Sequence, residues 1–453
     1  MFSQLELLLL VALAIFAVSC YRLKLGVFLV CALLPAYLIR TTIFGVPTTL
    51  LELAIYAIAI AWLLRTLVER RKTKVEHPSI VYRLSSLPLK FPILLILLAA
   101  AIGVIISPDK NAALGIFKAY FFDPILFFVV LINLGYLENL GNFGKENFQP
   151  KSYKLSPISY LLAGLAVAGL AVAGATITQA LTGGAVGGRV QAFYNTPNAV
   201  GLFLGPLVVL FGGLGLGYLG LRLFESIDSE RYLGNLGIQK KKKFLPTAHF
   251  LLATIFLVAV LLSQSRGAIL GIAGGAVFLV CVIFWQKKKI LLGLLGALGL
   301  LGLLGAWALA PRLANLMDTG GGNERLAIWQ GTWNMLLHHP IFGAGLAGFT
   351  DIYNNYKLAS QVSSPLYPHN IILNFWSELG LLGLFGVLGL FVSVLKKPFA
   401  ICHKPLAITM KATLIVILVH GLVDVPYFKN DLSVLFWIVI ALSVFGKTDK
   451  MQS

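Results

Sequence analysis

Residues 247–285 read TAHFLLATIFLVAVLLSQSRGAILGIAGGAVFLVCVIFW, two apolar runs joined by the short polar sequence Ser263-Gln264-Ser265-Arg266. Each run is close to the ~20 residues that an α-helix needs to cross the hydrocarbon core of a bilayer. The joining sequence is short enough only for a tight hairpin. This stretch therefore predicts two antiparallel membrane-spanning helices that meet at one membrane surface.

Similar apolar runs recur over the whole chain of 453 residues, of which 58% are hydrophobic and only 12% charged. A soluble domain has about 25% charged residues, and a membrane β-barrel would show short alternating strands. We therefore predict an all-α, polytopic helical membrane protein whose residues 1–453 form a single integral membrane domain. The candidate spans are 4–20, 25–39, 47–64, 91–107, 113–135, 157–180, 198–221, 247–263, 267–285, 290–309, 371–395, 407–422 and 431–446.

The first two candidates leave the number of spans open. If both cross, the protein has 13 transmembrane helices and an external amino terminus. If they merge, or if one inserts only halfway, it has 12 and both termini are inside. The first stretch lacks a basic amino-terminal region and a clear cleavage site, so we interpret it as a retained helix rather than a signal peptide.

The net charge of +18 predicts orientation rather than binding to nucleic acid, because the Lys and Arg residues gather in connections between apolar runs. Such connections stay on the cytoplasmic side. The basic runs Lys240–Lys243 and Lys287–Lys289 act as topology anchors in this interpretation, and they could also bind phospholipid headgroups. The cytoplasmic set is 65–90, 222–246, 286–289 and 396–404, and the external set is 181–196, 264–267, 310–370 and 423–430.

The cysteines indicate neither a disulfide framework nor a metal site. The four of them, Cys20, Cys31, Cys281 and Cys402, lie within or beside apolar runs and do not form a CxxC pair. No metal ion and no cofactor is predicted.

The external segment 310–370 is too long for a simple turn and carries a helical pattern of its own. Its apolar stripe is formed by Leu326, Trp329, Trp333, Leu336 and Leu337, with Gln330 and Asn334 off the stripe. We expect short helices in this loop, either along the membrane surface or capping the bundle.

Polar residues gather in four places on the predicted external face. These are Gly187-Gly188-Arg189 with Asn195-Thr196-Pro197-Asn198, Ser263–Gly267, Gly322-Asn323-Glu324-Arg325, and Tyr367-Pro368-His369-Asn370. An arginine presents a planar fork that matches phosphate oxygens, so Arg189, Arg266 and Arg325 could hold a pyrophosphate. A histidine such as His369 is suited to accept a proton near neutral pH. In the alternative interpretation Arg189 and Arg325 are interfacial anchors and His369 is a capping or interfacial residue. Arg266 fits that alternative less well, because a tight hairpin between two spans seldom needs a charge.

Several ionisable residues fall inside predicted spans, where burial of a charge is costly. Lys118 and Asp123 could neutralise each other, and Glu52 is a further internal charge. Glu378, more than two turns below His369, could orient the bundle.

His420 and Asp424 are four residues apart and can share a helix face. In one interpretation Asp424 orients a catalytic group. In the other it forms a structural pair with His420.

Three runs resemble the shared core of the O-antigen ligase and polymerase (Wzy-type) superfamily. They are SQSRGAILG (263–271), GGNERLAIWQGTWNMLLHHPIFGAGLAGF (321–349) and PHNIILNFWSELGLLG (368–383). The later stretch HGLVDVPYFKNDLSVLFW (420–437) is also similar. The resemblance covers about 187–385 as the ligase-like core and includes the long external loop.

The resemblance implies a metal-independent, inverting glycosyltransferase of lipopolysaccharide or polysaccharide biosynthesis in a bacterial inner (plasma) membrane. Its donor would be a glycan on undecaprenyl pyrophosphate, used on the periplasmic or outer face, and its acceptor a lipid A-core or other saccharide. By position, His369 matches the catalytic histidine, and Arg189, Arg266 and Arg325 match the arginines that bind the donor pyrophosphate. Asn198, Glu378, His420 and Asp424 are candidate supporting residues.

Other functions remain open at this point. The loop does not separate a ligase from a polymerase. A transporter or flippase of a lipid-linked or anionic solute would also use internal carboxylates and external arginines, although neither a broken helix nor an internal repeat is evident. A non-catalytic membrane scaffold would not need arginines and a histidine on one face.

Overall fold

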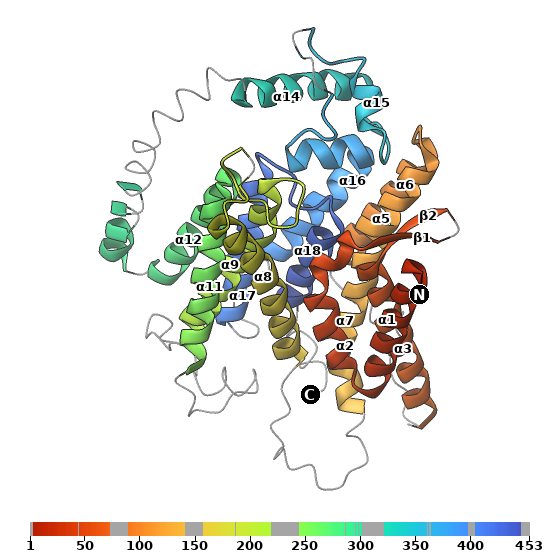
Figure 1. Ribbon diagram of the computed structural model, residues 1–453. Coiled ribbons are helices and arrows are strands. Elements are labelled where there is room, and N and C mark those ends of the chain that lie inside the picture. The colour runs from red at the N-terminus through yellow and green to blue at the C-terminus, as the bar shows by residue number, and fades with distance from the viewer. Residues whose placement is uncertain are drawn as a thin grey trace.

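The computed structural model describes residues 3–43, 45–72, 89–140, 157–185, 187–218, 244–285, 287–294, 296–297, 299–300, 321–359, 361, 364–396 and 404–444. These residues form a helical bundle with one small β-hairpin, which confirms the all-α membrane architecture (Figure 1). Lys240–Lys243, 141–156 and 301–320 lie outside the described residues, and with them the second half of the predicted span at 290–309.

Most of the described helices run along the bundle (Figure 1). The first group is α1 (Gln4–Tyr21), α2 (Leu23–Ala32), η1 (Leu34–Leu38), α3 (Leu50–Lys72), α5 (Lys90–Ile106), α6 (Lys110–Ile116), the π-helical η2 (Phe117–Phe122) and α7 (Asp123–Leu140). The second is α8 (Pro157–Leu181), α9 (Pro197–Tyr218), α11 (Phe244–Ser263), α12 (Arg266–Phe284), α14 (Gly321–His338), α15 (Phe349–Tyr353), α16 (Ile371–Leu395), α17 (Lys404–Gly421) and α18 (Asn430–Val444).

Within the described part of the chain, seven helices are long and apolar enough to cross a membrane. Five more apolar helices have 10–17 residues. Among these five is α2, which η1 extends toward the hairpin. A multi-pass membrane protein follows from these lengths and compositions.

The hairpin between α2 and α3 is an element that the sequence did not predict. Strand β1 (Arg40–Ile43) pairs antiparallel with β2 (Val46–Thr49), with Arg40 opposite Thr49 and Ile43 opposite Val46. The side-chain amide of Gln4 donates to the carbonyl of Arg40 (3.0 Å), so the start of α1 lies beside this hairpin.

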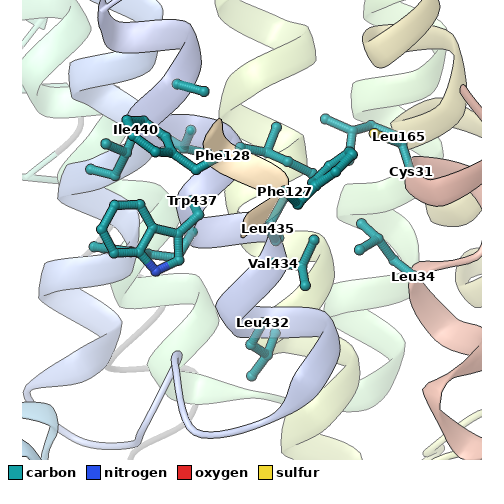
Figure 2. Close-up of a cluster of buried hydrophobic side chains, with 14 of the residues drawn as sticks. Cys31, Leu34, Phe127, Phe128, Leu165, Leu432, Val434, Leu435, Trp437 and Ile440 are labelled. Carbon is teal, nitrogen blue, oxygen red and sulfur yellow. The ribbon is translucent and has the colours of Figure 1, made fainter. Parts of the chain in front are cut away.

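The core lies around α18, in which every residue from Asn430 to Leu442 is buried. A helix that is apolar all round belongs in the middle of a bundle. Trp437 of α18 packs against Phe128 of α7 with ring centroids 5.1 Å apart, and Phe127 points toward Cys31, Leu34 and Leu165 (Figure 2). The central helix thereby joins the first helices of the chain to the last.

Several connections between helices lie together at one end of the bundle, where long-range hydrogen bonds join them. We call this the site end; it is uppermost in Figure 1. Arg189 reaches Ser263, Asn370 reaches Leu422, and the backbone of Leu346 donates to Gly103 at the end of α5. Helix α14 lies across this end, whereas the helices below it run along the bundle (Figure 1). The helical pattern predicted over 326–337 is confirmed by α14.

Helix α16 is interrupted at Gly380, whose φ of 65° and ψ of −170° are not helical. The segment Ile341–Ala347 lies against the break. The amide of Leu381 donates to the carbonyl of Ile341 (2.9 Å), and the amide of Ala344 donates to the carbonyl of Ser377 (2.6 Å). Backbone groups that the break frees are thus paired inside the protein, as they must be at membrane depth.

The expected neutralisation of Lys118 by Asp123 is wrong. The Lys118 ammonium instead lies 2.7 Å from the carboxylate of Glu52 and also donates to the hydroxyl of Thr48. Glu52 accepts a further hydrogen bond from Asn430 at the start of α18 (2.7 Å). The π-helical turn η2 contains Lys118, and the spacing of an ordinary α-helix was therefore a poor guide to its partner.

Candidate functional site

Arg189 lies in the connection between α8 and α9, just after two glycines whose positive φ values (58° and 75°) turn the chain toward α11. Its Nε donates to the carbonyl of Ser263 (3.1 Å), and its Nη2 donates to the carbonyl of Gln264 (3.2 Å). The guanidinium therefore binds the end of α11 and the hairpin that leads to α12.

Gln264 holds this hairpin in an unusual conformation, with φ of 53°. Its side-chain amide donates to the carbonyl of Gly188 (3.2 Å), while its own carbonyl accepts from Arg189. A non-glycine residue with positive φ costs free energy, and such residues often lie at functional sites. Gln264 fell within a predicted polar group, but nothing in the sequence indicated that its backbone would bind Arg189.

Asn198, in the first turn of α9, connects Arg189 to the turn that follows α17. Its side-chain oxygen accepts from Arg189 Nη2 (2.8 Å), and its side-chain amide donates to Asp424 Oδ2 (3.1 Å). The other Asp424 oxygen, Oδ1, lies 3.5 Å from His369 Nδ1. Four of the candidate residues thus form one continuous chain of contacts, which we call the Arg189–His369 chain.

Asp424 lies in the turn after α17, not on the helix, and is almost completely buried. Burial raises the pKa of its carboxyl, but the neighbouring His369, then His420 and the backbone amide of Val425, hold the pKa below its usual value of 3.8. The sequence allowed two interpretations of Asp424: it orients a catalytic group, or it forms a structural pair with His420. Among the described residues, its carboxylate contacts are with His369, Asn198 and Val425.

His369 has a left-handed backbone, with φ of 50°, and its flanking residues are fixed on both sides. The indole of Trp329 donates to the carbonyl of Pro368 (2.9 Å). Asn370 caps α16 by accepting from the amides of Ile372 and Leu373, and its side-chain amide donates to the carbonyl of Leu422. The imidazole is therefore held between α14, α16 and the turn that carries Asp424, with 29% of its side chain exposed.

The other two arginines lie close enough to act on the same groups. Burial lowers the pKa of Arg189, and the positive charges of Arg266 and Arg325 lower it further. Burial and Asp424 raise the pKa of Tyr367 to about 12, against the opposing charge of Arg325. Arg266 is the first residue of α12 and Arg325 lies in the first turns of α14, so two helix amino termini add to the positive field.

Two candidates are placed differently. Glu378, in α16, accepts from the backbone amide of Ala347 (2.9 Å) and fixes the segment beside the helix break, so it is separate from the Arg189–His369 chain. His420 is buried beside Gly267, the residue after Arg266, and a Cβ at Gly267 would lie 2.7 Å from its Nε2. His420 therefore packs beneath Arg266 rather than in the chain itself.

No group of three His, Cys, Asp or Glu side chains that could hold a metal ion is found among the residues that the structure describes. The site as described consists of guanidinium, imidazole, amide and carboxylate groups. Such a set can bind an anion and move a proton.

Part of this region is similar to a known protein family. The family model described as O-antigen ligase matches residues 251–388, which include Arg266, Arg325 and His369; Arg189, Asn198, His420 and Asp424 lie outside the match. No curated protein matches the chain. The match confirms, over residues 251–388, the resemblance stated from the sequence: this part of the chain is similar to the O-antigen ligase family.

Proposed function

We propose that the protein transfers a glycan from an undecaprenyl-pyrophosphate donor to a saccharide acceptor, without a metal and with inversion at the anomeric carbon. The observation that carries the proposal is the Arg189–His369 chain, which joins a phosphate-binding group to a proton-accepting group through Asn198 and Asp424. The match of residues 251–388 to the O-antigen ligase family supports glycan transfer in general. The donor, the acceptor and the residue roles are our proposal.

The three arginines form the donor site in this proposal. The charges of Arg266 and Arg325 both act on Arg189, so the positive charge at Arg189 is destabilised until an anion binds there. The amino terminus of α12 also favours an anion there. Its capping residue Ser265 has a buried hydroxyl oxygen without a hydrogen-bond partner among the described residues. A pyrophosphate would relieve the repulsion and gain charge-assisted hydrogen bonds.

His369 acts as the general base in this proposal. Its Nδ1 faces Asp424, so a proton held there leaves Nε2 free to accept the proton of an acceptor hydroxyl. The contact of 3.5 Å is longer than an ordinary hydrogen bond, as is common before substrate binds. Asp424 then stabilises the imidazolium that forms.

The bond changes balance in a single displacement. The acceptor oxygen forms a bond to the anomeric carbon of the donor and gives its proton to His369 Nε2. The bond between that carbon and the pyrophosphate oxygen breaks, and its electron pair leaves with the pyrophosphate, which the arginines stabilise. Attack opposite the leaving group inverts the configuration.

The functional unit is larger than the predicted ligase-like core. The core over 187–385 contains Arg189 and His369, but Asp424 lies 39 residues beyond its end. The external loop 310–370 contributes Arg325 and Trp329. We therefore assign the site to the whole 1–453 domain, with the turn after α17 as part of it.

The topology that fits this function has 13 spans in a bacterial inner membrane. In it, the site end faces the periplasm or exterior, where lipid-linked glycans are used. The start of α1 lies beside the hairpin at Arg40, which supports a topology in which α1 and the α2–η1 segment each cross the membrane and the amino terminus is outside. The carboxyl terminus, after α18, is then cytoplasmic.

A transporter or flippase is the alternative, and the break in α16 is the observation that would favour it, because broken helices form ion and solute sites in transporters. Here the freed carbonyl of Ser377 and amide of Leu381 bind the segment Ile341–Ala347. The break is thus occupied by the chain itself. Glycan transfer remains the better account, and a scaffold gives no reason for the Arg189–His369 chain.

The experiment is a transfer assay with purified protein in liposomes, given an undecaprenyl-pyrophosphate-linked oligosaccharide and candidate acceptors. We expect release of undecaprenyl pyrophosphate that depends on the acceptor. Transfer to a lipid A-core acceptor would identify a ligase, and a lengthened lipid-linked glycan would identify a polymerase. Movement of the intact donor across the bilayer without transfer to any acceptor would reject the proposal in favour of a flippase.

A further inference from the structure

Helix α14 has apolar residues on two opposite sides, although a helix that caps a bundle needs only one. Ile328, Thr332 and Met335 are buried against the rest of the loop and α16. On the far side, Leu326, Trp333 and Leu337 are 60%, 49% and 62% exposed. A stripe of three large apolar side chains at helical spacing is not explained by the packing of the protein.

The two remaining sides of α14 carry polar residues, and each lies in a different environment. At about 100° per residue, Arg325 and Trp329 lie together on one flank. There Arg325 acts on Arg189 and Trp329 holds the carbonyl of Pro368. Asn334 and His338 lie on the opposite flank, and His338 is exposed. The helix therefore separates a site flank from a polar flank, with the apolar stripe between them.

The apolar stripe continues onto surfaces that face lipid in a membrane-spanning bundle. The ring of Trp333 packs edge-on against Trp376 of α16 at 5.8 Å, and the indole of Trp376 donates to the carbonyl of Pro340. Next to Pro340, Ile341 and Phe342 are exposed beside the helix break. Farther along α16, the exposed side chains of Phe385, Leu388 and Val392 form the outer face of a candidate span.

We propose that α14 is an interfacial helix whose stripe Leu326-Trp333-Leu337 is immersed in the bilayer leaflet at the site end. Three observations support a lipid partner: the continuity of the stripe with the outer face of α16, the orientation of α14 across the bundle (Figure 1), and two tryptophans at the junction. Tryptophan is enriched at this level of a membrane, and helices with one apolar stripe and polar flanks lie in the interface.

The position has a consequence for the site. A helix that lies in the interface holds its flanks at the depth of the lipid phosphates. Arg325, on the site flank, would then lie where the pyrophosphate of a membrane-anchored donor is found. This consequence rests on the proposed function, whereas the immersion of α14 rests only on the bundle crossing the membrane.

The test uses nitroxide spin labels on two consecutive residues of α14, in the full chain with its four native cysteines replaced. Leu337→Cys places the label on the apolar stripe, and His338→Cys places it about 100° around the helix on the polar flank. The protein is reconstituted in phosphatidylethanolamine and phosphatidylglycerol vesicles. Collision rates are measured with oxygen, which concentrates in lipid, and with a water-soluble nickel complex.

We expect the label at 337 to collide mainly with oxygen and its nickel accessibility to be several-fold below that at 338. Equal nickel accessibility at both positions would overturn the proposal, because the stripe would then lie in water. Shielding of the label at 337 from both reagents would also overturn it, since a second protein surface rather than lipid would then cover the stripe. Neither readout depends on glycan transfer, so this proposal and the enzymatic one can fail separately.

Discussion

At the scale of single residues, the carboxylate of Asp424 holds two partners at once, the amide of Asn198 and the imidazole of His369. Through Asn198 it is also joined to the guanidinium of Arg189. Binding of an anion at Arg189 can therefore alter the position of His369 through two intervening side chains. This connection makes Asp424 a positioning residue rather than one that touches substrate.

Asp424→Asn should lower kcat by about 10²–10⁴-fold, the range expected when a general base is lost or misplaced, while the KM for donor changes little. An amide keeps the shape of the side chain but cannot stabilise the imidazolium, so the pH profile of the residual activity should also change. Asp351→Asn, an exposed aspartate of α15, is the matched control and should leave activity unchanged. Equal losses in the two variants would remove Asp424 from the mechanism.

Stability at acid pH should also depend on Asp424, because its folded-state pKa is lower than its ordinary value of 3.8. A depressed carboxyl pKa contributes stability that is complete above the unfolded pKa and is lost as pH falls through the folded one. The thermal midpoint of the wild type in detergent should therefore exceed that of Asp424→Asn by a constant margin at neutral pH. The margin should shrink only below about pH 4. A margin that closes near pH 6 would contradict this account.

The sequence singled out His369 and the three arginines as candidates from residue type and order along the chain, and their roles stay predictions. It did not predict their partners. Asn198 and Asp424 are 226 residues apart, and no local pattern connects them. The same is true of Lys118 and Glu52, which pair across the bundle in place of the expected Lys118 and Asp123.

At the scale of elements, α16 depends on a segment that precedes it in the chain and packs against the break at Gly380. Ile341–Ala347 supplies the backbone partners of the break, and Glu378 fixes that segment through the amide of Ala347. The first half of α16 begins at Asn370, directly after His369. The break therefore sets the direction of the half-helix that positions the proposed base.

Gly380→Ala should lower the free energy of unfolding by about 2 kcal/mol or more, because its φ and ψ are confined to glycine. A Cβ there would also collide with the carbonyl of Ile341. The measurement is the thermal or denaturant midpoint in detergent. In Gly389→Ala, on the same helix, the nearest neighbour of a Cβ is Pro92 at 3.6 Å, an ordinary contact, so that variant should be as stable as the wild type or more so. Equal midpoints would show that the break is not strained.

The sequence predicted the existence of α14 from its apolar stripe, but not which of its faces would be buried. Leu326, Trp333 and Leu337 were part of the predicted stripe and are exposed, whereas Ile328 and Met335 are buried. The break in α16 was not predicted, because Gly380 lies in a run with several other glycines and leucines. What sets Gly380 apart from these glycines is a contact from elsewhere in the chain, the hydrogen bond between the amide of Leu381 and the carbonyl of Ile341.

At the scale of the whole molecule, the fully buried α18 ties the carboxyl-terminal helices to the amino-terminal ones. The site end is built from connections spread over most of the chain, from Arg189 to Asp424. The lengths of the apolar runs and the placement of the charged residues predicted many membrane spans from the sequence. The packing order of those spans depends on contacts of α18 with α7 and α9 that no run of hydrophobic residues specifies.

The proposed topology predicts opposite sides for the two termini. In a chain without native cysteines, a cysteine at Ser3 should react with a membrane-impermeant maleimide on intact cells. A cysteine at Gln452 should react only after the membrane is permeabilised. Protection of both positions in intact cells would support 12 spans with both ends inside and would contradict the 13-span arrangement.

The most direct test of the central claim is single-turnover glycan transfer by His369→Ala, with binding of the undecaprenyl-pyrophosphate donor measured on the same sample. We expect transfer to fall by about 10²–10⁴-fold or to vanish while the donor affinity stays close to that of the wild type. His339→Ala, whose imidazole contacts Tyr356 rather than Asp424, serves as the control and should transfer normally. Transfer by His369→Ala at the wild-type rate would contradict the account, because the Arg189–His369 chain would then end in a residue that takes no part in the reaction.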